Sequence, residues 1–95
     1  MFSHGVDEEF LKKEKSAART LRNSQWWKRQ KSIGVCHYCH QQFRSSELTM
    51  DHIVPMIRGG RSTKGNVVPS CKACNTEKRD NLLMDWKGYL GKDES

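Results

Sequence analysis

Apolar residues are sparse along this chain, and their spacing near the start indicates a helix. Phe10, Ala17 and Leu21 recur on one helical face, as expected for a helix that is buried on one side. This spacing predicts a helix from Asp7 to about Arg22. Its first residues are acidic, which suits the positive end of the helix dipole.

The two tryptophans that follow do not continue this face, which predicts a break near Asn23-Ser24. Ser24 is a suitable N-cap for a second short helix that ends near Lys31. We expect Trp26 and Trp27 to pack on the rest of the domain. Stacking on bases or sugars is the alternative for these two side chains.

The middle of the chain has the pattern of two strands joined by a polar loop. Residues 47–54 combine β-branched side chains with partial alternation, and Pro55 limits their continuation. Residues 56–65 contain three glycines and three cations, a composition typical of a loop. Residues 66–69 form a second short apolar run, so a hairpin with a long basic connection is predicted.

A last helix is predicted from Asn75 to about Trp86, with Leu82, Leu83 and Trp86 available for the core and Gly88 near its end. The local order is then strand, strand, helix, which is a small α+β unit. We expect three parts along the chain: a basic helical extension over residues 1–32, a compact domain over 33–90 and a tail over 91–95.

Size and composition limit the stability that an apolar core can provide. The chain has 95 residues, of which 35% are hydrophobic, so a structural metal or disulfides would be useful. The first residues do not combine a basic start with an apolar run, so we expect no secretory signal and a cytoplasmic location. In that reducing setting, cysteine pairs more often hold metal than form disulfides.

The four cysteines form two C-x-x-C pairs, a spacing that can aim four thiolates at one ion. The predicted structural Zn²⁺ ligands are Cys36, Cys39, Cys71 and Cys74. His37 and His40 could each replace a cysteine, but we expect both at the surface or beside the site. Residues 36–40 also match the C-x-x-C-H motif of covalent haem attachment, which would leave the second pair unexplained.

Charge is unevenly distributed: 17 Lys and Arg against 11 Asp and Glu give a net charge of +6. The excess lies in residues 11–31 and 44–79. Such local charge suits a polyanion, because neutralising phosphates releases bound counterions; a solvated helix face is equally compatible. No stretch approaches the roughly 18 apolar residues of a membrane span, so no membrane partner is expected.

The residues between the cysteine pairs carry a more specific pattern. The run C-H-Y-C … M-D-H-I-V-P-M-I-R-G-G-R-S-T-K-G-N-V-V-P-S-C-K-A-C-N-T-E-K, over residues 36–79, resembles the four-cysteine, zinc-bearing branch of the HNH endonucleases. Asn75 is one departure, because some members carry a histidine there. The resemblance implies a ββα-metal fold, also called the His-Me finger, in which two strands and a helix hold one divalent cation.

The resemblance also implies roles for residues at the matching positions. Asp51 and Asn75 would be ligands of a catalytic Mg²⁺ or Mn²⁺, and His52 would be the general base. Asn66 would orient His52 or fix the loop that carries it. Adjacent strand residues point to opposite sides, so a bend near Asp51-His52 is expected to bring both side chains to one site.

The expected activity is metal-dependent hydrolysis of DNA phosphodiester bonds to 5′-phosphate and 3′-hydroxyl ends, with weak sequence specificity. Nicking, cleavage of both strands by a homodimer, and an RNA substrate all remain compatible with the sequence. A catalytically silent zinc module that binds nucleic acid is the main alternative. Expected phosphate contacts are basic residues in or after the glycine-rich loop: Arg58, Arg61, Lys64, Lys78 and Arg79.

Overall fold

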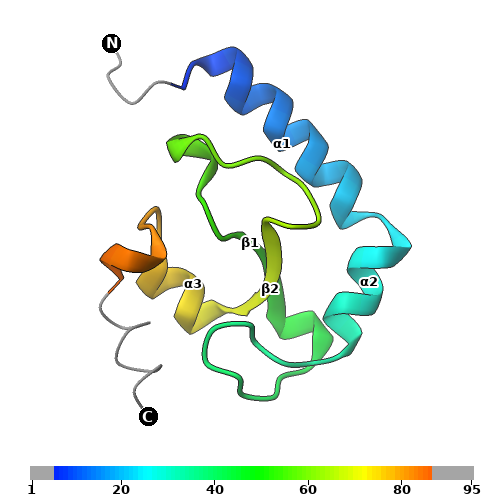
Figure 1. The fold of residues 1–95 in the computed structure, drawn as a ribbon. Helices are drawn as coiled ribbons and strands as arrows, with labels where there is room; N and C mark the ends of the chain where they lie inside the picture. The colour runs from blue at the N-terminus through cyan, green and yellow to red at the C-terminus, as the bar shows by residue number, and fades with distance from the viewer. Residues whose placement is uncertain (1–5, 87–95) are drawn as a thin grey trace.

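The computed structural model describes residues 6–86 of the chain. Its helices are α1 (Glu8–Arg22), α2 (Gln25–Ser32) and α3 (Lys72–Lys78), and its strands are β1 (Leu48–His52) and β2 (Val67–Cys71). Figure 1 shows the β1–β2 hairpin between α3 on one side and the α1–α2 arm on the other. The predicted tail over 91–95 and the predicted helix end at Gly88 lie outside the described residues.

The N-terminal helices follow from local capping signals, and both predictions are confirmed. Asp7 accepts a hydrogen bond from the Phe10 N–H at 2.8 Å, and Ser24 accepts one from the Trp27 N–H at 3.1 Å. Such bonds satisfy amide groups that have no partner inside the helix. The break between the two helices therefore lies at Asn23 and Ser24.

The tryptophans of α2 have different environments. Trp27 is only 2% exposed and lines a cleft together with Leu48 and Met50 of β1, which confirms that it packs on the central part of the molecule. Trp26 is half-buried, and the Lys64 ammonium lies 5.5 Å from its ring centroid. The arm therefore contacts both the hairpin and its connecting loop.

Strands β1 and β2 pair in antiparallel register from Leu48 opposite Cys71 to His52 opposite Val67. Strand β1 is shorter than predicted, because the backbone bends at Ile53 and Val54. Strand β2 continues to Cys71, beyond the predicted end at residue 69. The hairpin thus places the second cysteine pair at the end of the sheet.

The predicted helix from Asn75 to Trp86 is wrong in both bounds. Helix α3 begins at Lys72, where the Cys71 side chain caps it, and ends at Lys78. A separate 3-10 turn covers Leu83–Asp85. A helix continued to Trp86 would carry this residue about 18 Å along the axis from Cys74, whereas Trp86 instead folds back to Tyr38, with 5.2 Å between ring centroids.

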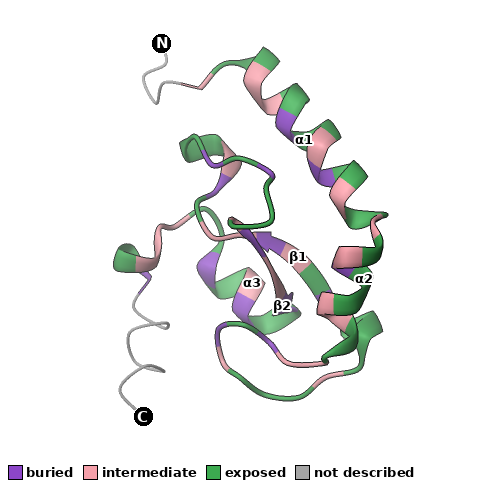
Figure 2. Ribbon diagram, turned by 45° about the vertical axis from the view of Figure 1, so that its right-hand side comes forward, coloured by how far each residue is buried: buried purple, intermediate pink, exposed green. Residues whose placement is uncertain are grey.

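Buried segments of the hairpin and α3 lie close together (Figure 2). The core that they form is small and centred on the cysteines. Phe43 and Leu83 are partly buried against it, and Leu82 is half-buried. The buried core residues are Cys36, Tyr38, Leu48, Cys71, Cys74 and Trp86. Within residues 6–86, helices fall short of the length and apolar character that crossing a bilayer demands.

Candidate active site

The four cysteine side chains converge beside the hairpin. Their sulfur atoms all lie within 4.8 Å of one another, and all four thiols are free of disulfide bonds. Thiolates bound to tetrahedral zinc at about 2.3 Å would lie about 3.8 Å apart; the Sγ atoms of Cys39 and Cys71 are 4.0 Å apart. The cluster therefore has the donor set and spacing to bind zinc.

Backbone amides around Cys36 favour the thiolate that a metal requires. Burial alone would raise the pKa of this thiol, but hydrogen bonds from backbone N–H groups outweigh burial and lower the pKa to about 7. The N–H groups of Tyr38 and Cys71 each lie 3.4 Å from the Cys36 sulfur. His37 and His40, by contrast, are exposed and do not belong to the sulfur cluster.

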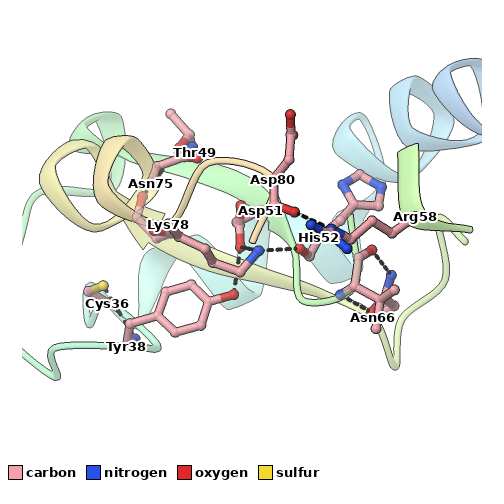
Figure 3. Close-up of polar contacts among 12 residues, drawn as sticks. Cys36, Tyr38, Thr49, Asp51, His52, Arg58, Asn66, Asn75, Lys78 and Asp80 are labelled. Atoms are coloured by element: carbon pink, nitrogen blue, oxygen red, sulfur yellow. Dashed lines mark hydrogen bonds and ion pairs between the residues drawn. The ribbon is translucent and has the colours of Figure 1, made fainter. Parts of the chain in front are cut away.

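Two buried side chains, those of Tyr38 and Lys78, hold Asp51 in place (Figure 3). Its Oδ2 accepts a hydrogen bond from the Tyr38 hydroxyl at 2.5 Å and lies 3.3 Å from the Lys78 ammonium. The same ammonium donates to the backbone carbonyl of His52 at 2.9 Å. Both of these contacts use Oδ2, and Oδ1 takes part in neither.

The structure contradicts the expected phosphate contact of Lys78. Its side chain is 0% exposed, and its ammonium is directed at Asp51 and His52 inside the molecule. Lys78 follows Cys74 by four residues on α3, and residues four apart share a helix face. That spacing is a sequence signal that would have placed Lys78 towards the core.

Replacing Lys78 with alanine is expected to reduce the free energy of unfolding by about 3–5 kcal/mol, because it leaves the Asp51 carboxylate buried without its cation. Chemical denaturation followed by circular dichroism measures this loss. Lys72, an exposed lysine on the same helix, is the matched control, and its change to alanine should alter stability by less than about 0.5 kcal/mol. Equal stability of the two variants would contradict the importance of the buried pair.

His52 lies at the end of β1, and its imidazole points away from the side that Asp51 occupies (Figure 3). Its Nε2 lies 2.9 Å from the Ser62 hydroxyl oxygen. Burial, with smaller contributions from Arg22 and Lys78, lowers the pKa of His52 below its usual value despite the opposing effect of Asp51. A lowered pKa favours the neutral imidazole, the form that can accept a proton.

Asp51 and His52 share one cavity, although their side chains have different partners. The cavity has a volume of about 200 Å³, and Asn75, Arg79 and Asp80 also line it. The bend expected at Asp51-His52 lies instead at Ile53 and Val54, after both residues. The two side chains thus keep the alternation of a strand.

Asn66 fixes the backbone of the connecting loop (Figure 3). Its Oδ1 accepts a hydrogen bond from the Val54 N–H at 2.9 Å, and its Nδ2 donates to the carbonyls of Val54 at 3.0 Å and Arg61 at 2.9 Å. None of these three bonds reaches the imidazole of His52. Asn66 therefore holds together the two ends of the loop that follows His52.

Asn75 is oriented by a neighbour on β1. Its Nδ2 donates to the Thr49 hydroxyl at 3.0 Å, which assigns the amide nitrogen to Thr49 and leaves the amide oxygen outside this bond. Asn75 lines the same cavity as Asp51. One carboxylate and one amide oxygen are donors of the type that Mg²⁺ and Mn²⁺ prefer, so the chemistry of these two donors suits such a cation.

The remaining predicted phosphate contacts are exposed but partly engaged within the molecule. Arg58 Nε donates to the Asp80 carbonyl at 2.7 Å. Arg61 lies 3.6 Å from a Glu14 carboxylate oxygen and 5.6 Å above the Phe10 ring. Lys64 lies over Trp26.

Arg79 differs from these three cations, because it lines the cavity of Asp51 and His52. Its φ of +50° is rare for a non-glycine residue.

Three partners of the candidate site residues were not predicted from the sequence: Tyr38, Thr49 and Ser62. Tyr38 lies inside the first cysteine pair, where nothing local indicates a contact with Asp51. Ser62 contacts a helix residue that is 48 positions away. Thr49 precedes Asp51 by two residues on β1, so alternation alone would have placed both on one face of the strand.

The family described as HNH endonuclease matches residues 36–86, which is more than half of the chain. No curated protein matches the chain. The matched region contains both cysteine pairs, the hairpin and α3, which confirms the expected small α+β domain of the ββα type. The chain therefore belongs to the HNH endonuclease family, and this membership implies a nuclease acting on nucleic acid.

Proposed function

We propose that the protein is a metal-dependent endonuclease that hydrolyses DNA phosphodiester bonds to 5′-phosphate and 3′-hydroxyl ends. The observation that carries this proposal is the shared cavity of His52, Asp51 and Asn75. It brings His52, whose pKa is lowered by burial, next to two residues with oxygen donors for a cation. A module that only binds nucleic acid has no need of this combination.

His52 is the general base in this proposal. Its neutral imidazole takes a proton from a water molecule, and the water oxygen attacks the phosphorus in line with the 3′-oxygen. The bond from phosphorus to the 3′-oxygen breaks, and this oxygen takes up a proton from solvent. The hydrogen bond to Ser62 at 2.9 Å holds the ring in one orientation. Asn66 supports this arrangement by fixing the loop that contains Ser62.

Asp51 and Asn75 would hold a divalent Mg²⁺ or Mn²⁺ ion, which when bound supplies positive charge to the phosphate and the leaving oxygen. Tyr38 and Lys78 hold Asp51 through Oδ2, so Oδ1 is the oxygen left for the cation. Thr49 holds the Asn75 amide nitrogen in the corresponding way. The two donors are therefore oriented by residues of this chain.

The four-cysteine cluster would hold a separate, structural Zn²⁺. Soft thiolates suit zinc, whereas the oxygen donors of Asp51 and Asn75 suit a harder ion. Asn75 directly follows Cys74 on α3, so folding around zinc also fixes the position of a proposed ligand of the catalytic cation. One metal would serve folding and the other would serve catalysis.

Phosphate contacts are proposed for exposed cations near the cavity. Arg79 is the nearest candidate, because it lines the cavity itself. Arg58, Arg61 and Lys64 lie on or beside the glycine-rich loop and would contact neighbouring phosphates along the backbone. Such contacts carry little sequence information, which is consistent with weak sequence specificity.

Nicking of supercoiled plasmid is expected to stop after chelation and to return with Mg²⁺ or Mn²⁺. Zinc content is measured in the same samples, so that loss of the structural ion is not mistaken for loss of the catalytic one. Cleavage at full rate without any added divalent ion would contradict the cation site. A gel shift with plasmid DNA and no nicking under any metal would favour the silent binding module.

A further inference from the structure

Helix α1 reaches the glycine-rich loop at Ser62, directly beside the proposed base. The Ser62 hydroxyl lies 2.7 Å from the backbone carbonyl oxygen of Glu14 and 2.9 Å from His52 Nε2. The Ser62 N–H donates to the Glu14 carboxylate at 2.6 Å. Glu14 and Ser62 are only 5% and 8% exposed, so water competes little for these bonds.

The direction of these bonds determines which ring nitrogen of His52 carries the proton. A serine hydroxyl has one hydrogen to donate and lone pairs to accept with, and a backbone carbonyl only accepts. The single Ser62 hydrogen is therefore directed to the Glu14 carbonyl. His52 Nε2 must then donate to the Ser62 oxygen, which leaves Nδ1 of the neutral ring without a proton.

We propose that Ser62, held by Glu14 of α1, is a positioning residue that fixes His52 in its Nε2–H tautomer with Nδ1 as the basic atom. The inference rests on the proposed role of His52 as the base. It extends that role by assigning the reacting nitrogen. It also makes the N-terminal arm part of the active site, although Glu14 lies outside the family match over 36–86.

Two further features keep the loop where Ser62 can contact both Glu14 and His52. A Cβ atom at Gly60 would lie 1.7 Å from the Val54 carbonyl oxygen, so only glycine lets the loop pass this close before it reaches Ser62. Arg61 lies 3.6 Å from the second Glu14 carboxylate oxygen. Glu14 thus contacts two successive loop residues, and the hydroxyl of Ser62 has little freedom to turn away from His52.

Changing Ser62 to alanine is expected to lower kcat for plasmid nicking by about 10- to 100-fold, the scale for removing a partner that orients a histidine. KM for DNA should change little, because Ser62 is buried and does not face substrate. Ser62→Thr keeps the hydroxyl and should recover most of the lost kcat. Ser16→Ala, which removes an exposed hydroxyl from α1, the helix that contains Glu14, is the control.

Nitrogen NMR of protein with ¹⁵N-labelled histidine provides a second measurement that a purely structural role would not change. His52 should be the Nε2–H tautomer in the wild type and a mixture of tautomers in Ser62→Ala. Glu14→Ala keeps the Ser62 hydroxyl but removes the carboxylate that holds the loop, and it should lower kcat in the same direction. This variant serves as the test if Ser62→Ala does not fold.

The outcomes separate this proposal from the proposed function. The positioning role of Ser62 is overturned if the wild type nicks DNA and His52→Ala does not, while Ser62→Ala retains full kcat and the wild-type tautomer. A wild type that does not cleave under any metal overturns the proposed function instead. In that case the tautomer spectra still decide whether Ser62 fixes the ring, since they need no substrate.

Discussion

Replacement of Cys71 by serine is expected to leave residues 36–86 without a stable fold. Cys71 joins β2 to α3, and its sulfur also caps α3 by accepting a hydrogen bond from the Cys74 N–H at 3.5 Å. Structural zinc contributes roughly 10–16 kcal/mol to folding in zinc-finger peptides. A small domain has a net stability of only about 5–15 kcal/mol, so a variant that no longer binds zinc loses more than the core can supply.

Circular dichroism melting and zinc analysis of the purified variant measure this effect. Ala73→Ser is the matched control, because it introduces the same residue at an exposed position between Cys71 and Cys74 without removing a thiolate. The control should contain as much zinc as the wild type and melt at the same temperature. A Cys71→Ser variant that melts like the control would show that the cluster does not stabilise the fold.

The same measurements distinguish zinc from the disulfides that four cysteines could also form. A disulfide requires sulfur atoms about 2.0 Å apart, whereas those of Cys39 and Cys71 are 4.0 Å apart. A reducing agent should therefore leave the melting temperature of the wild type unchanged, while a strong chelator should lower this temperature. The opposite pair of responses would indicate disulfides.

The features that could be predicted from the sequence have local causes. Helices α1 and α2 begin at caps three residues before the amides they satisfy, and a short window contains that information. The hairpin and the cysteine cluster were predictable because alternation and C-x-x-C spacing are also local patterns. The fold class therefore followed from short-range chemistry.

The end of α3 could not be predicted because its cause lies elsewhere in the chain. The apolar residues Leu82, Leu83 and Trp86 are spaced as if they continued a helix. Trp86 instead packs against Tyr38 beside the cysteine cluster, and reaching that position requires the chain to turn at Arg79. Packing of a residue pair 48 positions apart thus overrode local helix propensity.

The candidate site, too, could be predicted only in part. Asp51, His52, Asn66 and Asn75 could be named from a motif, but the residues that orient them could not. Lys78 is an example, because its charge suggested a phosphate contact while its buried ammonium holds Asp51. The polar environment of a site depends on which elements meet, and only the fold supplies that.

Changing His52 to alanine is expected to reduce the rate of DNA nicking by about 10² or more, the usual contribution of a general base. The backbone carbonyl that accepts from Lys78 remains in this variant, so the buried pair of Lys78 and Asp51 is kept. The variant loses the hydrogen bond to Ser62, which costs about 1 kcal/mol of stability. Catalysis should therefore fail in a protein that still folds.

Single-turnover nicking with saturating Mg²⁺ measures the rate, and gel shift, zinc content and melting temperature establish that the variant is otherwise intact. His40→Asn is the control, because it removes an exposed histidine at a φ of +64°, a conformation that asparagine tolerates. This control should nick at the wild-type rate. Because neutral His52 contributes no charge to binding, DNA affinity should be equal in both variants. If His52→Ala nicked DNA at the wild-type rate, another group would have to accept the proton, and the assignment of the base would be wrong.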